Sequence, residues 1–147
     1  MLHGSSYFSS KEFACKCGCG FGTLETDIAP ELIFALHILR QSLNIPFVVT
    51  SGARCVNHNT NQGGKPKSTH LPGVKGLCTP SYVGKCRAVD IQSVAWSTDL
   101  RGRAVVLALS MGLRVGLATT FIHVDVESPP YYSEGIWNYS ASEDSGI

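Results

Sequence analysis

The sequence predicts an α+β domain in which helices flank a small antiparallel sheet. Two stretches, near residues 30–44 and 98–111, carry apolar side chains at helical spacing. Three shorter runs, 47–50, 87–91 and 121–127, are rich in the β-branched residues that favour strands. We expect the small sheet to carry Asp90 and His123 and the two helices to pack against it.

The composition restricts the classes of function. The 147 residues suffice for one domain with a hydrophobic core, so we treat 1–147 as a single domain. A net charge of +1 gives no support for general nucleic-acid binding, which would need a concentrated basic face. No apolar stretch reaches the ~20 residues of a membrane span, and the amino terminus lacks the pattern of a secretory signal. We therefore expect the protein to act in the cytoplasm or to leave by a route that the sequence does not encode, such as release by lysis or carriage on a virus particle.

The first helix is bounded by recognisable signals. Residues 1–26 are expected to be irregular, with glycines interrupting a cysteine cluster. Asp27 can cap the helix that follows, and Pro30 suits its first turn. Asn44 and Pro46 should end it.

The middle of the chain returns to strand. The run 47–50 should be a buried strand, and Arg54 follows its end, where catalytic groups are often held. A short helix is expected over 55–62. The second long helix, 98–111, should stop at Gly112.

A strand pair is expected near the carboxyl end, formed by 113–118 and 121–127. Because side chains alternate between the two faces of a strand, His123 and Asp125 should point toward one site. The polar tail, 140–147, is expected to be frayed.

Three residues are candidate ligands of a metal ion. His70, Asp90 and His123 each lie in a local pattern that a zinc hydrolase would need. Two imidazoles and one carboxylate leave the fourth tetrahedral position of Zn²⁺ for water, as in catalytic rather than structural sites. The sequence therefore predicts a zinc centre.

The cysteines leave several interpretations open. They are Cys15, Cys17, Cys19, Cys55, Cys78 and Cys86. The first three alternate with other residues, which is not the spacing of a zinc finger. They could form disulfides or stay as buried free thiols, or they could join Cys55 in a second, structural metal site. A cysteine hydrolase that uses Cys55 with His58 is a further hypothesis, although no third orienting group is evident.

At these residues the chain resembles the zinc D-Ala-D-Ala carboxypeptidase family, whose fold is shared with the hedgehog amino-terminal domain. The family pattern, Ser-x-His-x-x-Gly-x-Ala-x-Asp and a later histidine in a strand, is matched by Ser68, His70, Gly73, Ala88, Asp90 and His123. The Ser-Gly-x-Arg segment ending at Arg54, with His58 and Asn59, resembles the small cell-wall peptidase branch carried by many bacteriophages. The opening, Phe8 to Cys15, fits that branch too, so the resemblance covers about residues 8–127.

The resemblance implies a zinc-dependent peptidase that hydrolyses peptidoglycan stem or cross-bridge peptides, as an endolysin or virion lysin. Its partners would be peptidoglycan peptides and phage structural proteins, with no nucleic acid and no membrane. It also implies His70, Asp90 and His123 as the Zn²⁺ ligands. The alternative is a metal-containing module of a phage particle that binds cell wall without hydrolysing it.

The first departure from the family pattern is an insertion. His70 and Asp90 lie twenty positions apart rather than the family's seven, and the extra residues fit best as 74–86. We expect this loop to border the zinc cleft. A disulfide between Cys78 and Cys86 could close its base in an oxidising compartment.

The second departure concerns the general base. Where relatives carry an acid or a histidine, this chain has Thr120 and Phe121. Asp125 is the nearest carboxylate on the His123 face and Glu127 the next, so Asp125 is our candidate base. It could instead only support a ligand histidine by a hydrogen bond. Arg54 could stabilise an oxyanion, clamp a substrate carboxylate, or be a plain surface residue.

Overall fold

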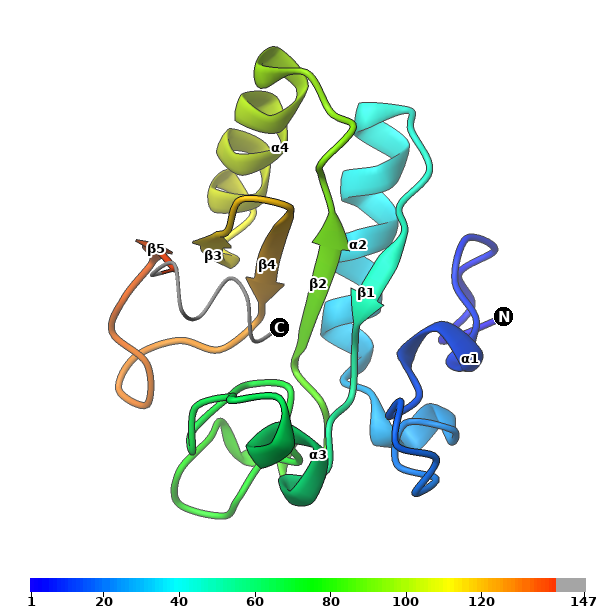
Figure 1. The fold of residues 1–147 in the computed structure, drawn as a ribbon, viewed down its shortest axis with the longest axis vertical. Helices are drawn as coiled ribbons and strands as arrows, with labels where there is room; N and C mark the ends of the chain where they lie inside the picture. The colour runs from blue at the N-terminus through cyan, green and yellow to red at the C-terminus, as the bar shows by residue number, and fades with distance from the viewer. Residues whose placement is uncertain (140–147) are drawn as a thin grey trace.

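A five-stranded sheet forms the centre of the protein in a computed structural model that describes residues 1–139 (Figure 1). Its strands are β1 (Val49–Ser51), β2 (Ala88–Gln92), β3 (Arg114–Leu117), β4 (Phe121–Asp125) and β5 (Ile136–Asn138), in the order β1-β2-β4-β3-β5. Neighbouring strands are antiparallel, except that β5 runs parallel to β3. The α+β class is confirmed. The antiparallel sheet differs from this expectation only at its edge, where β5 runs parallel to β3 because the chain returns there after a long connection.

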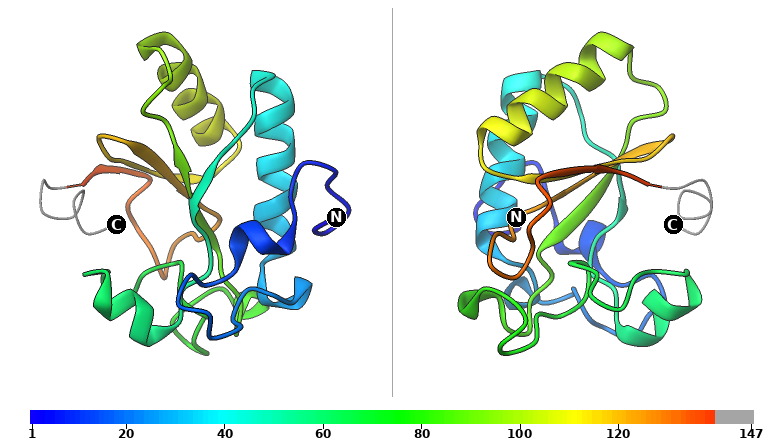
Figure 2. Two further views of the ribbon diagram at one scale, coloured as in Figure 1. Left: turned by 45° about the vertical axis from the view of Figure 1, so that its right-hand side comes forward. Right: turned by 90° about the vertical axis from the view of Figure 1, so that its left-hand side faces the viewer.

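Two long helices, α2 (Pro30–Leu43) and α4 (Thr98–Ser110), pack side by side against the sheet (Figure 2). The short elements are α1 (Ser10–Phe13), α3 (Val56–Asn61), η1 (Glu25–Asp27) and η2 (Pro80–Tyr82). Both long helices match the predicted ranges to within a residue. None of the helices in residues 1–139 has the length and apolar character that a membrane crossing requires.

The carboxyl end of α2 is as predicted, but its amino end is not. Asn44 ends the helix in the left-handed region, with φ 54°, and donates its N–H to Arg40 O. Asp27, however, does not cap the helix, because Ala29 holds the N-cap position. The Asp27 carboxylate instead accepts the N–H groups of Gly22 (2.9 Å) and Leu24 (3.2 Å) and closes the preceding turn. The predicted cap was therefore wrong.

The two faces of the sheet have different roles. One face carries Val89, Ile91, Val115, Ile122 and Val124, which belong to the hydrophobic core with the apolar side of α2. Burial of this face against the helices is the main source of stability. The residues that alternate with these on the central strands point to the opposite face.

The strand register aligns residues of the opposite face in a row across the sheet. Asp90 on β2 is paired with His123 on β4, His123 with Gly116 on β3, and Gly116 with Trp137 on β5. Gly116 is needed there, because a Cβ would lie 2.8 Å from the Trp137 ring. The register thus brings two of the predicted metal ligands together across the sheet.

The inserted segment 74–86 folds onto the protein rather than standing free. Isolated bridges join Gly73 to Val83 and Ile28 to Cys86. Cys78 and Cys86 are both buried and free, so the disulfide that we expected is absent. Cys86 Sγ donates to Ala88 O at 3.1 Å, and burial raises the pKa of this thiol to about 12. Backbone pairing and burial of these side chains order the loop in place of a covalent closure.

Candidate metal centre

His70, Asp90 and His123 converge at one buried point. Asp90 Oδ1 lies 2.9 Å from His123 Nδ1 and 3.2 Å from His70 Nε2. One ligand atom from each residue lies within 4.8 Å of the others. All three residues are at most 3% exposed. The three ligands that the sequence predicted are therefore brought together.

His70 is aimed by the loop that carries it and by the end of β1. Its Nδ1 lies 2.6 Å from the carbonyl of Gly52, and because a carbonyl only accepts, Nδ1 bears the proton. This leaves Nε2 unprotonated and pointing at Asp90. The His70 carbonyl in turn accepts the Arg54 N–H at 3.0 Å. Ser68 Oγ accepts the His70 N–H at 3.2 Å, so this serine serves the turn.

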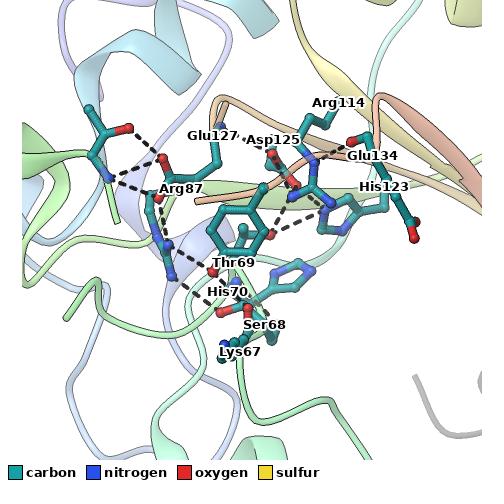
Figure 3. A network of polar contacts seen from close by, with 12 residues as sticks. Lys67, Ser68, Thr69, His70, Arg87, Arg114, His123, Asp125, Glu127 and Glu134 are labelled. Atoms are coloured by element: carbon teal, nitrogen blue, oxygen red, sulfur yellow. Dashed lines mark hydrogen bonds and ion pairs between the residues drawn. The ribbon is translucent and has the colours of Figure 1, made fainter. Parts of the chain in front are cut away.

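His123 is held from the opposite side of its ring by Asp125. Asp125 Oδ2 lies 2.8 Å from Nε2 of His123, while Nδ1 faces Asp90. Thr69 donates its hydroxyl to the same Oδ2 at 3.1 Å, and Arg114 NH1 lies 3.2 Å from it. Figure 3 shows the contacts of Asp125 with Arg114 and His123. A carboxylate on the outer nitrogen of a ligand histidine fixes its orientation and raises its basicity.

These residues fit a zinc ion. Ligand atoms about 2.0–2.1 Å from a tetrahedral zinc lie ~3.3 Å from one another, close to the two separations from Asp90 Oδ1. Asp90 Oδ2 is buried and, among the described residues, accepts no hydrogen bond. A buried carboxylate oxygen without a donor is costly unless a cation satisfies it. The donor set of two imidazoles and one carboxylate is that of catalytic zinc.

The charges of the metal-free site follow from its contacts. Burial opposes the charged form of Asp90, but the two histidines outweigh it and hold the pKa of this carboxyl well below its usual range. Burial also disfavours the charge of His123, yet its hydrogen bonds to Asp125 and Asp90 raise its pKa to about 9. Burial lowers the pKa of His70. Asp90 is thus ionised, His70 is neutral, and His123 carries a proton that a metal must displace.

Arg54 lies at the edge of the centre, as its place after β1 predicted. The residue is 4% exposed, so it is not a plain surface residue. Its NH2 lies 3.9 Å from Asp90 Oδ2, and its NH1 donates to Asn59 Oδ1 at 3.1 Å. Asn59 is itself buried and donates to Lys65 O at 2.9 Å. This chain of contacts fixes a cationic group beside the ligands.

The three-ligand centre opens on a cavity of about 650 Å³. Its walls include His70, His123, Asp125, Arg54, Lys65, Lys67, Arg114, Tyr131, Tyr132, Trp137 and Tyr139. The Arg114 guanidinium contacts two rings, 4.7 Å from the centroid of Tyr132 and 4.5 Å from that of Trp137. The Trp137 ring lies 5.3 Å from the His123 ring.

Sequence reasoning missed Arg114 as part of the site. It also missed the aromatic wall of the cavity, which consists of Tyr131, Tyr132, Trp137 and Tyr139. The aromatic residues after the second predicted strand were visible, but nothing in their spacing showed that β5 would pair with β3. The alternation of β3 would have placed Arg114 on the same face as Gly116 once the register was known.

Two expectations about the surroundings of the centre were wrong. No residue of the segment 74–86 lines this cavity. Glu127, our second choice of base, is turned away from it as well. Its carboxylate pairs with Arg87 at 2.9 Å and accepts the Thr79 hydroxyl at 2.6 Å. Thr79 belongs to the inserted loop, so Glu127 draws the loop against the protein instead of over the cleft.

Buried Arg87 completes this anchor. Its NH2 donates to the carbonyls of Ser68 (3.2 Å) and Leu71 (3.0 Å), and its backbone N–H donates to Thr69 O at 3.0 Å. Through these contacts Arg87 and Glu127 hold the loop that carries His70 in place (Figure 3).

The remaining acid–base alternatives can be compared directly. Thr120 is exposed and Phe121 is an apolar buried residue, so neither offers a proton acceptor. Asp125 is the carboxylate that touches His123 and lines the cavity. Cys55 contacts other thiols and the backbone N–H of His58 (3.4 Å), which is not the arrangement of a nucleophile with its base.

A buried His-Asp-His set that opens on a cavity, on an α+β scaffold, defines a metal-dependent hydrolase. A comparison with family models agrees: the model described as Peptidase M15 matches residues 6–125. The chain belongs to this family of zinc metallopeptidases. No curated protein and no solved structure was found to match it.

Proposed function

We propose that this protein is a zinc-dependent peptidase that hydrolyses peptidoglycan stem or cross-bridge peptides. The observation that carries the proposal is the three-ligand centre, whose fourth side faces a cavity of about 650 Å³. A structural zinc site would be closed by a fourth protein ligand. Membership of the M15 family supports the peptidase class.

When bound, zinc would supply a water of lowered pKa and a Lewis acid for the scissile carbonyl. Asp125 is our candidate to take up the proton of the attacking water, since its carboxylate lines the cavity next to His123. Its contacts also support the positioning of His123, and a substitution can separate the two roles. Arg54 is placed to stabilise the oxyanion or to bind a substrate carboxylate, because its guanidinium is fixed and permanently charged.

The charge of the cavity favours substrates that carry carboxylates. Its cationic side chains are Arg54, Lys65, Lys67 and Arg114. Asp125 and Glu134 are its acidic ones. Stem peptides of peptidoglycan contain free carboxylates along and at the end of a short chain. Such a peptide would meet more positive than negative charge on entering the cleft.

We extend the proposal to a phage lysin, either free or carried on the virion. Its support is the resemblance of the segment around Arg54 and of the opening residues 8–15 to the small phage branch. Phage structural proteins are accordingly the second class of partner that we propose, beside peptidoglycan peptides.

Digestion of purified peptidoglycan tests the proposal. The zinc-loaded protein should release fragments whose masses identify the bond that is cut, and so separate carboxypeptidase from endopeptidase activity. His123→Ala should release none. The runner-up, a module that binds cell wall without hydrolysis, is favoured only by the absence of an acid at Thr120 and Phe121. It would be established if fully loaded protein sedimented with sacculi but released no fragments.

A further inference from the structure

Four cysteines form a second cluster, away from the His-Asp-His centre. Cys15, Cys17 and Cys19 come from the loop after α1, and Cys55 comes from the N-cap of α3. Their Sγ atoms all lie within 4.8 Å of one another. Cys17 Sγ lies 3.4 Å from Cys15 Sγ and 3.6 Å from Cys55 Sγ. Four thiols from two distant segments thus surround one point.

The sulfur separations distinguish between the interpretations that the sequence left open. A disulfide requires about 2.0 Å between sulfurs, and all four cysteines are free. Zinc–sulfur bonds of about 2.3 Å place tetrahedral thiolates ~3.8 Å apart, close to both measured separations. Free thiols usually behave as small buried hydrophobic groups. Cys17 and Cys19 are exposed, so apolar packing does not account for them.

The backbone of the cluster is shaped to present the sulfurs to one point. Gly18 and Gly20 have φ of 82° and 98°, a region that favours glycine, and they turn the chain between and after the last two cysteines of the motif. Two backbone N–H groups point at sulfur: that of Cys55 at Cys15 Sγ (3.5 Å) and that of His58 at Cys55 Sγ (3.4 Å). Donors of this kind stabilise the negative charge of metal-bound thiolates.

We propose that Cys15, Cys17, Cys19 and Cys55 bind a second, structural zinc ion. The set is closed, with four protein ligands and no position for water, in contrast to the three-ligand centre. The ion holds the amino-terminal loop against the segment 52–55.

The bound ion would also organise the catalytic centre at a distance. The segment that it fastens supplies the Gly52 carbonyl that orients His70 and the Arg54 N–H that binds the His70 carbonyl. Ala53 between them donates to Phe13 O at 2.8 Å. A Cβ on Gly52 would lie 2.7 Å from Phe13 Cα, so the two segments pack without spare room. Fixing Cys55 therefore fixes the position of Arg54 and of Gly52, whose carbonyl orients His70.

Metal analysis of the purified full-length chain tests the proposal. We expect about two zinc ions per chain in the wild type and about one in Cys17→Ser. His123→Ala should also hold about one, now at the cysteines, and Cys78→Ala, which removes a buried thiol outside the cluster, should keep about two. Wild type with about one zinc that is lost entirely in His123→Ala would overturn the proposal.

Cobalt replacement provides a readout that does not depend on activity or on zinc content. Thiolate-to-cobalt charge-transfer absorption should appear in His123→Ala and be missing from Cys17→Ser. If Cys17→Ser does not fold, thiol titration of the wild type decides instead. Chelation should then increase the number of reactive thiols by about four. A disulfide among the four cysteines, detected by mass spectrometry of the chain as purified and before chelation, would show that the cluster is a covalent bridge.

Discussion

Asp125 and Asp90 contact opposite nitrogens of the His123 ring, at 2.8 Å and 2.9 Å respectively. Asp90 faces Nδ1, the nitrogen available to a metal, and Asp125 faces Nε2. This geometry follows from strand alternation, which puts Asp125 two residues after His123 on the same face of β4. The contact shows that Asp125 supports a ligand histidine, and acceptance of a proton at the cavity wall is the second role that we propose for it.

Asp125→Asn should reveal both effects. We expect the apparent zinc affinity of the His-Asp-His centre to fall about 10–100-fold, because the ligand imidazole loses its carboxylate partner. At saturating zinc, the rate of peptide hydrolysis should still be lower by roughly 10²–10⁴, the usual contribution of a general base. Kinetics across a zinc titration measure the two separately. Full activity at saturating zinc would mean that Asp125 only positions His123.

Glu127 is also a buried carboxylate near the end of β4, but it does not line the cavity, and its substitution should affect stability instead of catalysis. Glu127→Ala leaves the Arg87 guanidinium buried without its partner. We expect a loss of about 3–5 kcal/mol in the free energy of unfolding. Urea denaturation measures this, and the folded variant should retain its zinc. An unchanged stability would show that the Arg87 pair does not anchor the loop.

The raised pKa of His123 predicts a pH dependence of metal binding. With a pKa of about 9 against the ordinary 6.5, the metal-free folded protein holds a proton on His123 at neutral pH. The stability that this proton contributes is fully present below pH 6.5 and is lost as the pH rises through about 9. Because the proton must leave Nδ1 before a metal binds, zinc affinity should fall by up to about tenfold per pH unit below that value.

NMR titration of the His123 ring in metal-free protein checks this directly. The midpoint should lie near 9 and should move to lower pH in Asp125→Asn, which lacks one of the two carboxylates that raise it. A wild-type midpoint at or below 6.5 would contradict the arrangement of charges described for the site.

The parts of the site that the sequence predicted rest on local patterns. The alternation of β4 put His123 and Asp125 on one face, and the Ser68-to-Asp90 motif marked two ligands despite the insertion. Arg54 was found because polar groups that follow a strand often serve a site, although β1 (Val49–Ser51) is a half-buried edge strand and not the buried strand expected over 47–50. Each of these inferences uses residues that are close along the chain.

The parts that were missed depend on tertiary contacts between distant segments. β5 has only three residues, and its place beside β3 is set by pairing rather than by any period of its own. The path of the inserted loop was misjudged because it is decided by Thr79 and Glu127, far apart in sequence. Cys55 likewise meets Cys17 across 38 positions, so spacing alone could not choose between a disulfide and a metal site.

The aromatic wall gives the last prediction, which rests on the proposed peptidase function. Trp137 lies against the His123 ring and covers one face of the Arg114 guanidinium, which contacts Asp125 with its NH1. Trp137→Ala should remove a wall of the substrate cavity and the stacking that holds Arg114, an effect of about 1–2 kcal/mol. We therefore expect a rise in KM of roughly tenfold, with zinc content unchanged because no ligand is altered. Steady-state kinetics on a soluble stem peptide would measure it, with Tyr131→Ala, at a residue that lines the cavity but has no ring contact with His123, as the comparison. An equal effect of both substitutions would indicate a general loss of cavity surface, whereas loss of zinc in Trp137→Ala alone would show that the ring supports the ligand His123 rather than the substrate.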